Sequence, residues 1–236
     1  MSEGAPAAKR ARAGRDGNPV EVGYWKIKGL GQPIRLLLVW AGFEWKDTLY
    51  ECVQKNDGTT YDKSSWFDVK HKLGLPFPNL PYLVDGDLKI TQTNAILQHL
   101  ADRAGLSGTT EEERAKVNML FGLSGDVRRR YTGAAYSPKF DEMRPGLVES
   151  IEQKLAELDQ FLGSREYLVG QGVTVSDLLW YDLIDQFLVL DPTILDQRCP
   201  NLRAFHSRFH NDPKIVAYRE SDRFITQLNN TQAFFK

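Results

Sequence analysis

Residues 74–90 read GLPFPNLPYLVDGDLKI and decide the fold of the first hundred residues. The second half predicts a β-hairpin in which YLVD and LKIT are joined through Asp85-Gly86-Asp87. The first half has prolines at positions 76, 78 and 81, although a proline cannot donate to a β-ladder. A cis bond before Pro81 would turn the backbone N–H and C=O of Leu80 outward, toward an extended peptide. The stretch therefore predicts a sheet whose entrance presents Leu80 to a peptide-like ligand.

The segments around this hairpin predict a mixed α/β domain. Val20–Trp25 and Trp45–Glu51 are strand-like, and between them Pro33 opens the apolar run IRLLLVWAGF at a position where helices tolerate proline. Gln92–Ala104 has apolar residues at helical spacing and ends before Gly105. The order β-α-β followed by β-β-α is typical of a thioredoxin-like fold, here without a cysteine in the first strand-to-helix turn.

The second half of the chain predicts helices alone. Strand signals are nearly absent from Glu111 onward, and Thr174-x-x-Asp177 forms a capping box before another apolar run. One helical stripe consists of Leu147, Ile151, Leu155, Leu158 and Leu162. We expect a disordered extension over 1–19, an α/β domain over 20–104, a linker over 105–110 and an all-helical domain over 111–236.

The first 19 residues have no periodic apolar face, which is typical of a disordered segment. Their basic residues fit a nuclear address or a phosphate-binding arm, but a solubilising tail is the simpler interpretation; they are Lys9, Arg10, Arg12 and Arg15. Deletion of residues 1–18 is expected to leave the melting temperature and turnover unaltered.

Composition excludes several classes of partner. The net charge of −1 and the charged fraction of 26% give no global field that would attract nucleic acid or a membrane surface. Cys52 and Cys199 form no CxxC pattern, which argues against a disulfide framework and a thiolate metal site. The beginning of the chain lacks the apolar core of a signal peptide, and the apolar run 36–42 is too short to span a bilayer. A cytoplasmic protein is expected.

Two motifs are weak evidence for other chemistry. Gly29-Leu30-Gly31 has Ile34 where a dinucleotide-binding loop has its third glycine, so a tight turn is the better interpretation. His206 and His210 lie four residues apart and could share a metal, but no third ligand is evident and two surface histidines are more common. We expect no metal and no resident cofactor.

Three segments together resemble the mu class of cytosolic glutathione transferases. They are GYWKIKGLGQPIRLLL (23–38), SSWFDVKHKLGLPFPNLPYLVDGDLKITQTNAIL (64–97) and the spacing onward to Tyr136-Ser137-Pro138. The resemblance covers about Val20 to Phe224. It implies a thioredoxin-like first domain, a helical second domain with the electrophile site, a homodimer, and glutathione as co-substrate for conjugation to hydrophobic electrophiles. The rival hypothesis is a non-catalytic carrier of hydrophobic ligands, or a protein that binds a signalling partner, on the same fold.

The resemblance also implies roles for individual residues. Tyr24 matches the catalytic tyrosine, whose hydroxyl stabilises the glutathione thiolate; taken alone, it would be read as a core aromatic. Residues matching the site of the glycyl end are Trp25, Trp66, Lys70 and the assisting Lys63. The cysteinyl backbone is read by Asn79, Leu80 and Pro81. The γ-glutamyl carboxylate is held by Gln92 and Thr93, at the start of a helix that favours anions. Leu30 lines the pocket beside the sulfur.

Other matching positions concern the dimer and the second substrate. Asn118 replaces an aspartate that reaches across the dimer to the γ-glutamyl amine, so weaker glutathione binding is expected. Phe77 matches an aromatic residue that inserts between helices of the partner subunit. The electrophile site is expected to contain Leu30, Arg128, Tyr136, Asn230 and Thr231. Helix packing is an equally good account of Tyr136, and Asn230 replaces an aromatic residue, so substrate preference does not follow from the resemblance.

Overall fold

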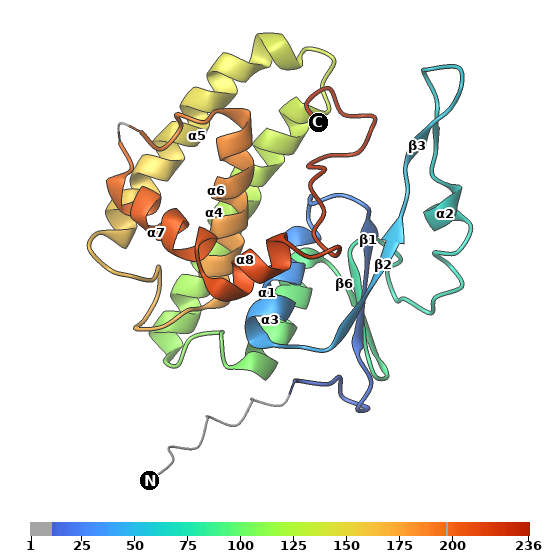
Figure 1. The fold of residues 1–236 in the computed structure, drawn as a ribbon, viewed down its shortest axis with the longest axis horizontal. Helices are drawn as coiled ribbons and strands as arrows, with labels where there is room; N and C mark the ends of the chain where they lie inside the picture. Colours follow the sequence, from blue (N-terminus) through green and yellow to red (C-terminus); the bar gives the residue numbers. More distant parts are fainter. Residues whose placement is uncertain (1–10, 197) are drawn as a thin grey trace.

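The structure, a computed structural model, describes residues 11–196 and 198–236. A sheet-containing domain is followed by a helical one (Figure 1). The elements of the first domain are β1 (Val20–Trp25), α1 (Gln32–Ala41), β2 (Trp45–Tyr50), β3 (Val53–Gln54), β4 (Tyr61–Asp62), α2 (Ser64–Phe67), β5 (Tyr82–Asp85), β6 (Leu88–Thr91) and α3 (Thr93–Ala104). This order confirms the predicted thioredoxin-like arrangement, to which the short strands β3 and β4 are added.

The main sheet has the strand order β2-β1-β5-β6. Strands β1 and β2 are parallel, with Tyr24 opposite Leu49, and β5 is antiparallel to both β1 and β6. The predicted hairpin is confirmed, and Gly86 at φ 62° supplies the left-handed conformation that its tight turn requires. Tyr24 therefore lies near the carboxyl end of a central strand.

Helices α1 and α3 lie between the sheet and the helical domain (Figure 1). Helix α1 begins beside Pro33 and ends at Gly42, whose φ of 69° caps the helix. Its apolar side chains join one buried cluster with β1, β5 and α3, including Val20, Val22, Ile34, Leu37, Leu38, Leu83, Ile96, Leu97 and Leu100. Each such burial stabilises the fold by roughly 1.5–3 kcal/mol. This core fixes the strand that carries Tyr24.

The second domain contains α4 (Glu111–Ala135), α5 (Phe140–Leu162), α6 (Val175–Leu190), α7 (Pro200–His210) and α8 (Pro213–Arg219). The predicted stripe of α5 is confirmed, because all five of its apolar residues are buried. The capping box is confirmed as well: the Asp177 carboxylate accepts hydrogen bonds from the backbone N–H groups of Thr174 and Leu168, both at 2.7 Å. Among the described residues, no helix is long and apolar enough to cross a membrane.

The prediction of a disordered extension over 1–19 is wrong from residue 11 onward. Residues 11–19, which we call the N-terminal strap, lie against the first domain. Arg12 forms an isolated parallel bridge with Phe43: its N–H donates to the Gly42 carbonyl at 2.7 Å, and its carbonyl accepts from the Glu44 N–H at 2.8 Å. Residues 1–10, with Lys9 and Arg10, lie outside the described residues.

The strap also covers a buried carboxylate. Asp85, at the end of β5, is fully buried and accepts hydrogen bonds from the Arg15 backbone N–H, the His99 ring and the Arg103 guanidinium. Arg103 donates in addition to the Ala13 carbonyl at 2.7 Å. The strap is thus held by backbone groups and by long polar side chains, which explains why a search for apolar periodicity misses it.

Candidate functional site

The turn after β1 is built around the Tyr24 hydroxyl. The Leu30 backbone N–H donates to the Tyr24 oxygen at 3.0 Å. Gly29 has a φ of 39°, and a Cβ there would lie 2.8 Å from the Tyr24 oxygen; a Cβ at Gly31 would lie 2.7 Å from the Tyr24 ring. Only glycine lets the backbone approach the phenol so closely. The interpretation of Gly-Leu-Gly as a tight turn is therefore confirmed.

This geometry makes Tyr24 a donor. One lone pair of its oxygen is occupied by the Leu30 N–H, so its own proton is available to another acceptor. The side chain is 6% exposed, and this burial raises the pKa of Tyr24 to about 12, with the Leu30 N–H and Arg128 acting in the opposite direction. The hydroxyl consequently keeps its proton at neutral pH.

The Arg128 guanidinium links the Tyr24 turn to helix α6 by hydrogen bonds. One guanidinium nitrogen donates to the Gly29 carbonyl at 3.0 Å, and another donates to the Asp182 carboxylate at 3.0 Å. Arg128 is 7% exposed. This side chain, expected to line the electrophile site, is thus engaged in holding the Tyr24 turn against α6.

The C-terminal tail completes the turn. The Lys28 N–H donates to the Gln227 carbonyl at 2.7 Å, and the Gly29 N–H donates to the Leu228 carbonyl at 3.1 Å. The Lys28 ammonium is 3.0 Å from the Asp185 carboxylate, and its side chain is 8% exposed. Residues about two hundred positions apart therefore form one unit around Tyr24.

The cis proline expected from the opening stretch is present, at Leu80-Pro81. Leu80 is buried in a cluster that also contains Tyr24 and Trp66, and Leu30 packs against this cluster. The Leu80 N–H is not free, however, because it donates to Oδ1 of Asn79 at 2.9 Å. A peptide-like ligand that pairs with Leu80 must first displace the Asn79 side chain.

The junction of β6 and α3 has an unusual backbone. Gln92 has φ 76° and ψ 118°, and among the described residues it is the one non-glycine residue with a positive φ. Such a conformation costs on the order of 1–3 kcal/mol and is found preferentially at ligand sites. It places the Gln92 side chain, which is exposed, beside Thr93 at the first turn of α3.

Basic and aromatic side chains lie on and around α2. Trp66 is 3% exposed and stacks on Tyr82, with 6.2 Å between the ring centroids. The Lys70 ammonium lies 5.1 Å from the Phe67 ring centroid, and the half-buried Lys63 precedes α2. Trp25, at the end of β1, packs against the same aromatic cluster.

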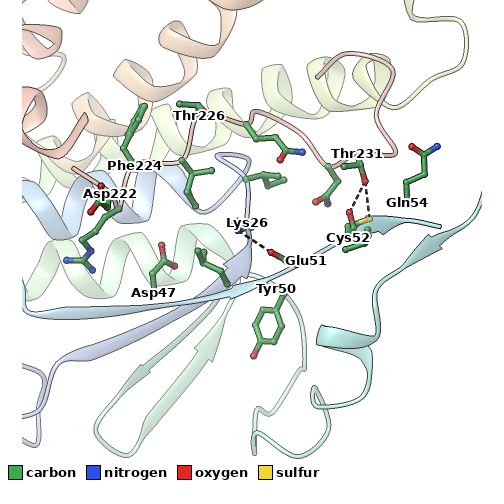
Figure 2. A pocket seen from close by; sticks show the side chains of 17 residues that line it. Lys26, Asp47, Tyr50, Glu51, Cys52, Gln54, Asp222, Phe224, Thr226 and Thr231 are labelled. Atoms are coloured by element: carbon green, nitrogen blue, oxygen red, sulfur yellow. Dashed lines mark hydrogen bonds and ion pairs between the residues drawn. The ribbon is translucent and has the colours of Figure 1, made fainter. Parts of the chain in front are cut away.

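The expected electrophile-site residues are only partly brought together. The Tyr136 hydroxyl accepts the Asn230 N–H at 3.0 Å, and burial raises the pKa of Tyr136. Asn230 and Thr231 line a groove of about 710 Å³ between β2 and the tail (Figure 2), where Thr231 donates to the Cys52 carbonyl at 2.8 Å. Tyr24 does not line this groove, so the groove is distinct from the turn around the Tyr24 hydroxyl.

Comparison with known proteins identifies the family of this arrangement. The model of the glutathione S-transferase N-terminal domain matches residues 20–102, and that of the C-terminal domain matches residues 125–222. Glutathione S-transferase Mu 1 of Oryctolagus cuniculus is 45% identical over 209 residues, which cover 88% of this chain and 93% of that protein. The chain belongs to the mu class of glutathione S-transferases.

Further relatives agree with this assignment. Glutathione S-transferase Mu 1 of Bos taurus is 44% identical over 209 residues, covering 88% of this mu-class chain and 93% of the bovine protein. The crystal structure of the glutathione S-transferase Blo t 8 superposes with a TM-score of 0.82 at 30% identity, over 90% of this chain and 98% of that chain. The similarity thus extends across both domains.

Sequence reasoning missed the parts of this glutathione S-transferase that position Tyr24. Asp182 and the backbone of residues 227–228 carry no local motif, and their roles depend on α6 and the tail reaching the turn in space. The glycines of the turn were the available signal, because a Gly-Leu-Gly beside a strand indicates close backbone approach. Asn118 is exposed and accepts a hydrogen bond from Gln98 at 2.7 Å.

Proposed function

We propose that this glutathione transferase conjugates the thiolate of reduced glutathione to hydrophobic electrophiles, with the Tyr24 hydroxyl donating a hydrogen bond to the sulfur. The observation that carries this proposal is the Leu30 N–H, which occupies the Tyr24 oxygen and leaves its proton to donate outward. A buried donor aimed at developing negative charge is a strong form of electrostatic stabilisation.

The chemistry follows from the thiol. A free thiol with a pKa of about 8.5 is mostly protonated at neutral pH, whereas the thiolate is the nucleophile. A hydrogen bond from Tyr24 favours the thiolate, which attacks the electrophilic carbon and forms a C–S bond. A leaving group then departs with the bonding electrons, or a proton adds to the carbanion formed from an activated double bond. The proposed reaction uses glutathione as a co-substrate and needs no resident cofactor.

Binding of the tripeptide is assigned to the groups around Tyr24. Lys70 and Lys63, with Trp66 and Trp25, offer positive charge and N–H donors to the glycyl carboxylate. At the other end, the exposed side chain of Gln92 and the first N–H groups of α3 suit the γ-glutamyl carboxylate, with Thr93 beside them.

The middle of glutathione is assigned to the cis-proline segment. Asn79 accepts the Leu80 N–H now, at 2.9 Å, and this bond is exchanged for one to the cysteinyl backbone. The exchange keeps the buried Leu80 amide satisfied in both states, so the bound tripeptide gains an acceptor contact at little cost. Pro81 holds the segment in place.

The proposed active form is a homodimer in which Phe77 of each subunit inserts into the other. Phe77 is 77% exposed, which is costly for an isolated aromatic side chain in water. A cavity of about 410 Å³ lies between α4 and α5. Leu123, Val127 and Ile151 form its apolar part, and the polar side chains around them are Asp126, Arg129, Arg130, Ser150 and Lys154. An aromatic anchor and a cavity with an apolar part on one chain form a self-complementary pair, as a two-fold dimer requires.

Steady-state conjugation of a halonitroarene tests the activity. We expect a rate above the uncatalysed background that saturates with glutathione and falls strongly in Tyr24→Phe. A rate equal to background in the wild-type protein would contradict the proposal and leave the carrier hypothesis, which no particular observation favours. Cytoplasmic location stays a prediction.

A further inference from the structure

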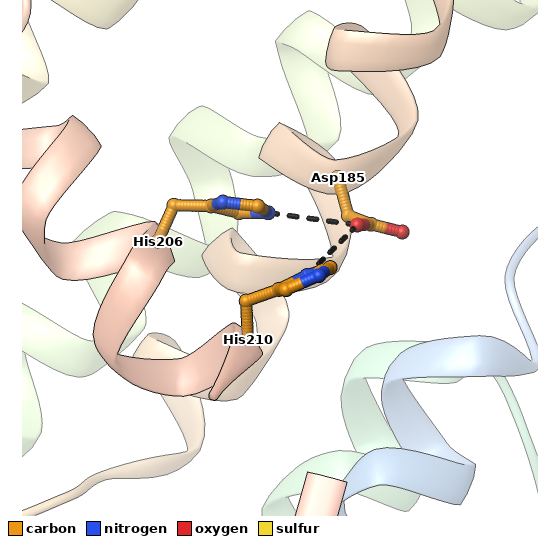
Figure 3. Close-up of side chains that lie close together, drawn as sticks. All are labelled: Asp185, His206 and His210. Carbon is orange, nitrogen blue, oxygen red and sulfur yellow. Dashed lines mark ion pairs between the residues drawn. The ribbon is translucent and has the colours of Figure 1, made fainter. Parts of the chain in front are cut away.

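A three-residue cluster lies outside the glutathione site, where α6 faces α7. The sequence offered no third ligand for His206 and His210, and the structure brings Asp185 to them. Figure 3 shows both imidazole rings directed at one carboxylate. Asp185 Oδ1 is 3.5 Å from Nε2 of His206 and 3.9 Å from Nδ1 of His210, and the three ligand atoms lie within 4.8 Å of one another.

We propose that Asp185, His206 and His210 bind a divalent transition-metal ion such as Zn²⁺. Two imidazoles and a carboxylate are a common donor set for zinc, with the fourth position left for water. Metal–ligand bonds of about 2.0–2.1 Å place tetrahedral ligand atoms roughly 3.4 Å apart. The two imidazole–carboxylate separations, 3.5 and 3.9 Å, are near this value, and all three ligand atoms lie within 4.8 Å, so side-chain rotations could close the site around an ion.

The state of His206 supports the proposal independently of the spacing. Its Nε2 is buried and makes no hydrogen bond within the described part of the chain, while the side chain is 13% exposed. The ring is fixed by stacking on Tyr181, with centroids 5.2 Å apart. Its Nε2 lies 3.5 Å from the Asp185 carboxylate, beyond good hydrogen-bond distance, and a bound ion would satisfy both groups.

Two cations adjoin the cluster and determine how tightly an ion binds. The Lys28 ammonium contacts Oδ2 of Asp185 at 3.0 Å, which leaves Oδ1 for the ion. Arg219 donates to Nε2 of His210 at 2.6 Å, so the ring proton is on Nδ1 in this state. An ion must displace that proton, and the proton then moves to Nε2 and drives away Arg219. Arg219 is exposed, so it can give up this hydrogen bond to solvent, and its charge is expected to weaken the site.

Titration of the full chain with Zn²⁺ tests the proposal. Glutathione is omitted because its thiol binds zinc, and Co²⁺ is used in parallel to report tetrahedral coordination by absorbance. We expect one ion per chain, with affinity reduced at least about tenfold in His206→Ala and in His210→Ala. His71→Ala is the matched control, because His71 is exposed and outside the cluster; its affinity should equal that of the wild type.

Arg219→Gln separates binding from folding. Removal of the neighbouring charge should tighten Zn²⁺ binding severalfold, a gain that a misfolded variant cannot mimic. Asp185→Asn is avoided because it also removes the Lys28 ion pair. The proposal is overturned if the wild type binds no Zn²⁺ at millimolar concentration. It is also overturned if both alanine variants retain wild-type affinity, or if Arg219→Gln binds no more tightly than the wild type.

Discussion

The backbone N–H of Leu30 donates to the Tyr24 hydroxyl oxygen over 3.0 Å, and this bond determines the chemical role of the phenol. Since the oxygen already accepts from the chain, its proton is left for a second acceptor, which in our proposal is the glutathione sulfur. The glycines on both sides of Leu30 bring the backbone close enough for this bond, and Arg128 and the tail hold the backbone there. Tyr24 is therefore oriented by main-chain groups, which side-chain substitution cannot easily remove.

Tyr24→Phe should lower kcat/KM by roughly two orders of magnitude, the usual effect of losing a donor to an anionic centre. The thiol pKa of bound glutathione should rise toward the free value of about 8.5. Burial raises the pKa of Tyr24 to about 12, so its hydroxyl keeps its proton over the pH range in which the glutathione thiol ionises. The activity deficit should therefore shrink as pH rises and the thiol ionises unaided.

Thiolate absorbance of bound glutathione measures this shift directly. Tyr218→Phe is a suitable control, because Tyr218 is also buried but lies on α8. Coincident titrations of wild type and Tyr24→Phe would make Tyr24 a packing residue.

Removal of residues 1–19 should destabilise the protein, contrary to the expectation from sequence. The deletion removes the Arg12 bridge to Phe43 and the contacts with Asp85 and Arg103. At about 0.5–1.5 kcal/mol for each hydrogen bond, we expect a loss of about 2 kcal/mol in the free energy of unfolding. Removal of residues 1–10 alone is the control, since it keeps the contacts that residues 11–19 make with the first domain. Chemical denaturation of both forms measures the difference, and equal stabilities would show that the strap contributes nothing.

The same deletion should have a defined pH dependence. Burial tends to raise the pKa of Asp85, but hydrogen bonds from His99 and the Arg15 N–H, with the charge of Arg103, lower it overall. A carboxylate whose pKa is lower in the folded protein contributes its full stabilisation at pH values above its unfolded pKa of about 3.9. This contribution is lost as the pH falls through the folded pKa. Loss of the Arg15 N–H raises the folded pKa. The cost of deletion should therefore be greatest at pH 7 and smaller below about pH 4, and a constant cost would contradict this account.

Phe77→Glu should shift the protein from dimer to monomer. The substitution places a charge where the proposal requires an aromatic ring in an apolar cavity, and anchor residues of this kind cost at least about 2 kcal/mol when truncated. Phe234→Glu is a matched control, because Phe234 is another exposed phenylalanine, at 58% against 77% for Phe77. Sedimentation velocity should detect dissociation only in the first variant. A dimer of unchanged strength in Phe77→Glu would remove Phe77 from the interface.

Asn118→Asp should tighten glutathione binding about fivefold. A carboxylate forms a charge-assisted hydrogen bond with an ammonium group, which is stronger than a neutral bond by about 1 kcal/mol. Asn211→Asp, beyond α7, adds the same charge at a remote position and should leave the affinity unchanged. Calorimetric titration with glutathione measures both. An unchanged affinity in Asn118→Asp would mean that this side chain does not approach the γ-glutamyl amine.

Structural elements that depend on short stretches of sequence could be predicted from the sequence alone. The hairpin at Gly86, the buried stripe of α5 and the capping box at Asp177 all follow from short-range patterns that the structure confirms. The resemblance placed Tyr24, Trp66 and Leu80 in one site, and they do share one cluster.

What could not be predicted depends on contacts between distant segments. Arg128 and Asp182 are 54 residues apart, and the cluster at Asp185 exists only because α7 packs on α6. The strap is held through backbone hydrogen bonds and a few polar side chains from distant segments, which leave no periodic pattern in the sequence. The positive φ of Gln92 could not be predicted from the sequence either, because glutamine rarely adopts this backbone conformation.

Pairing between the Tyr24 turn and residues 227–228 also bears on synthesis at the ribosome. Translation delivers the first domain early, and domains generally begin to fold in that order. The carbonyls of Gln227 and Leu228 that hold Lys28 and Gly29 emerge about two hundred residues after the turn itself. A nascent chain can thus form the sheet of its first domain while the Tyr24 turn still lacks these partners, and the turn is completed only once the segment with Gln227 and Leu228 has left the ribosome.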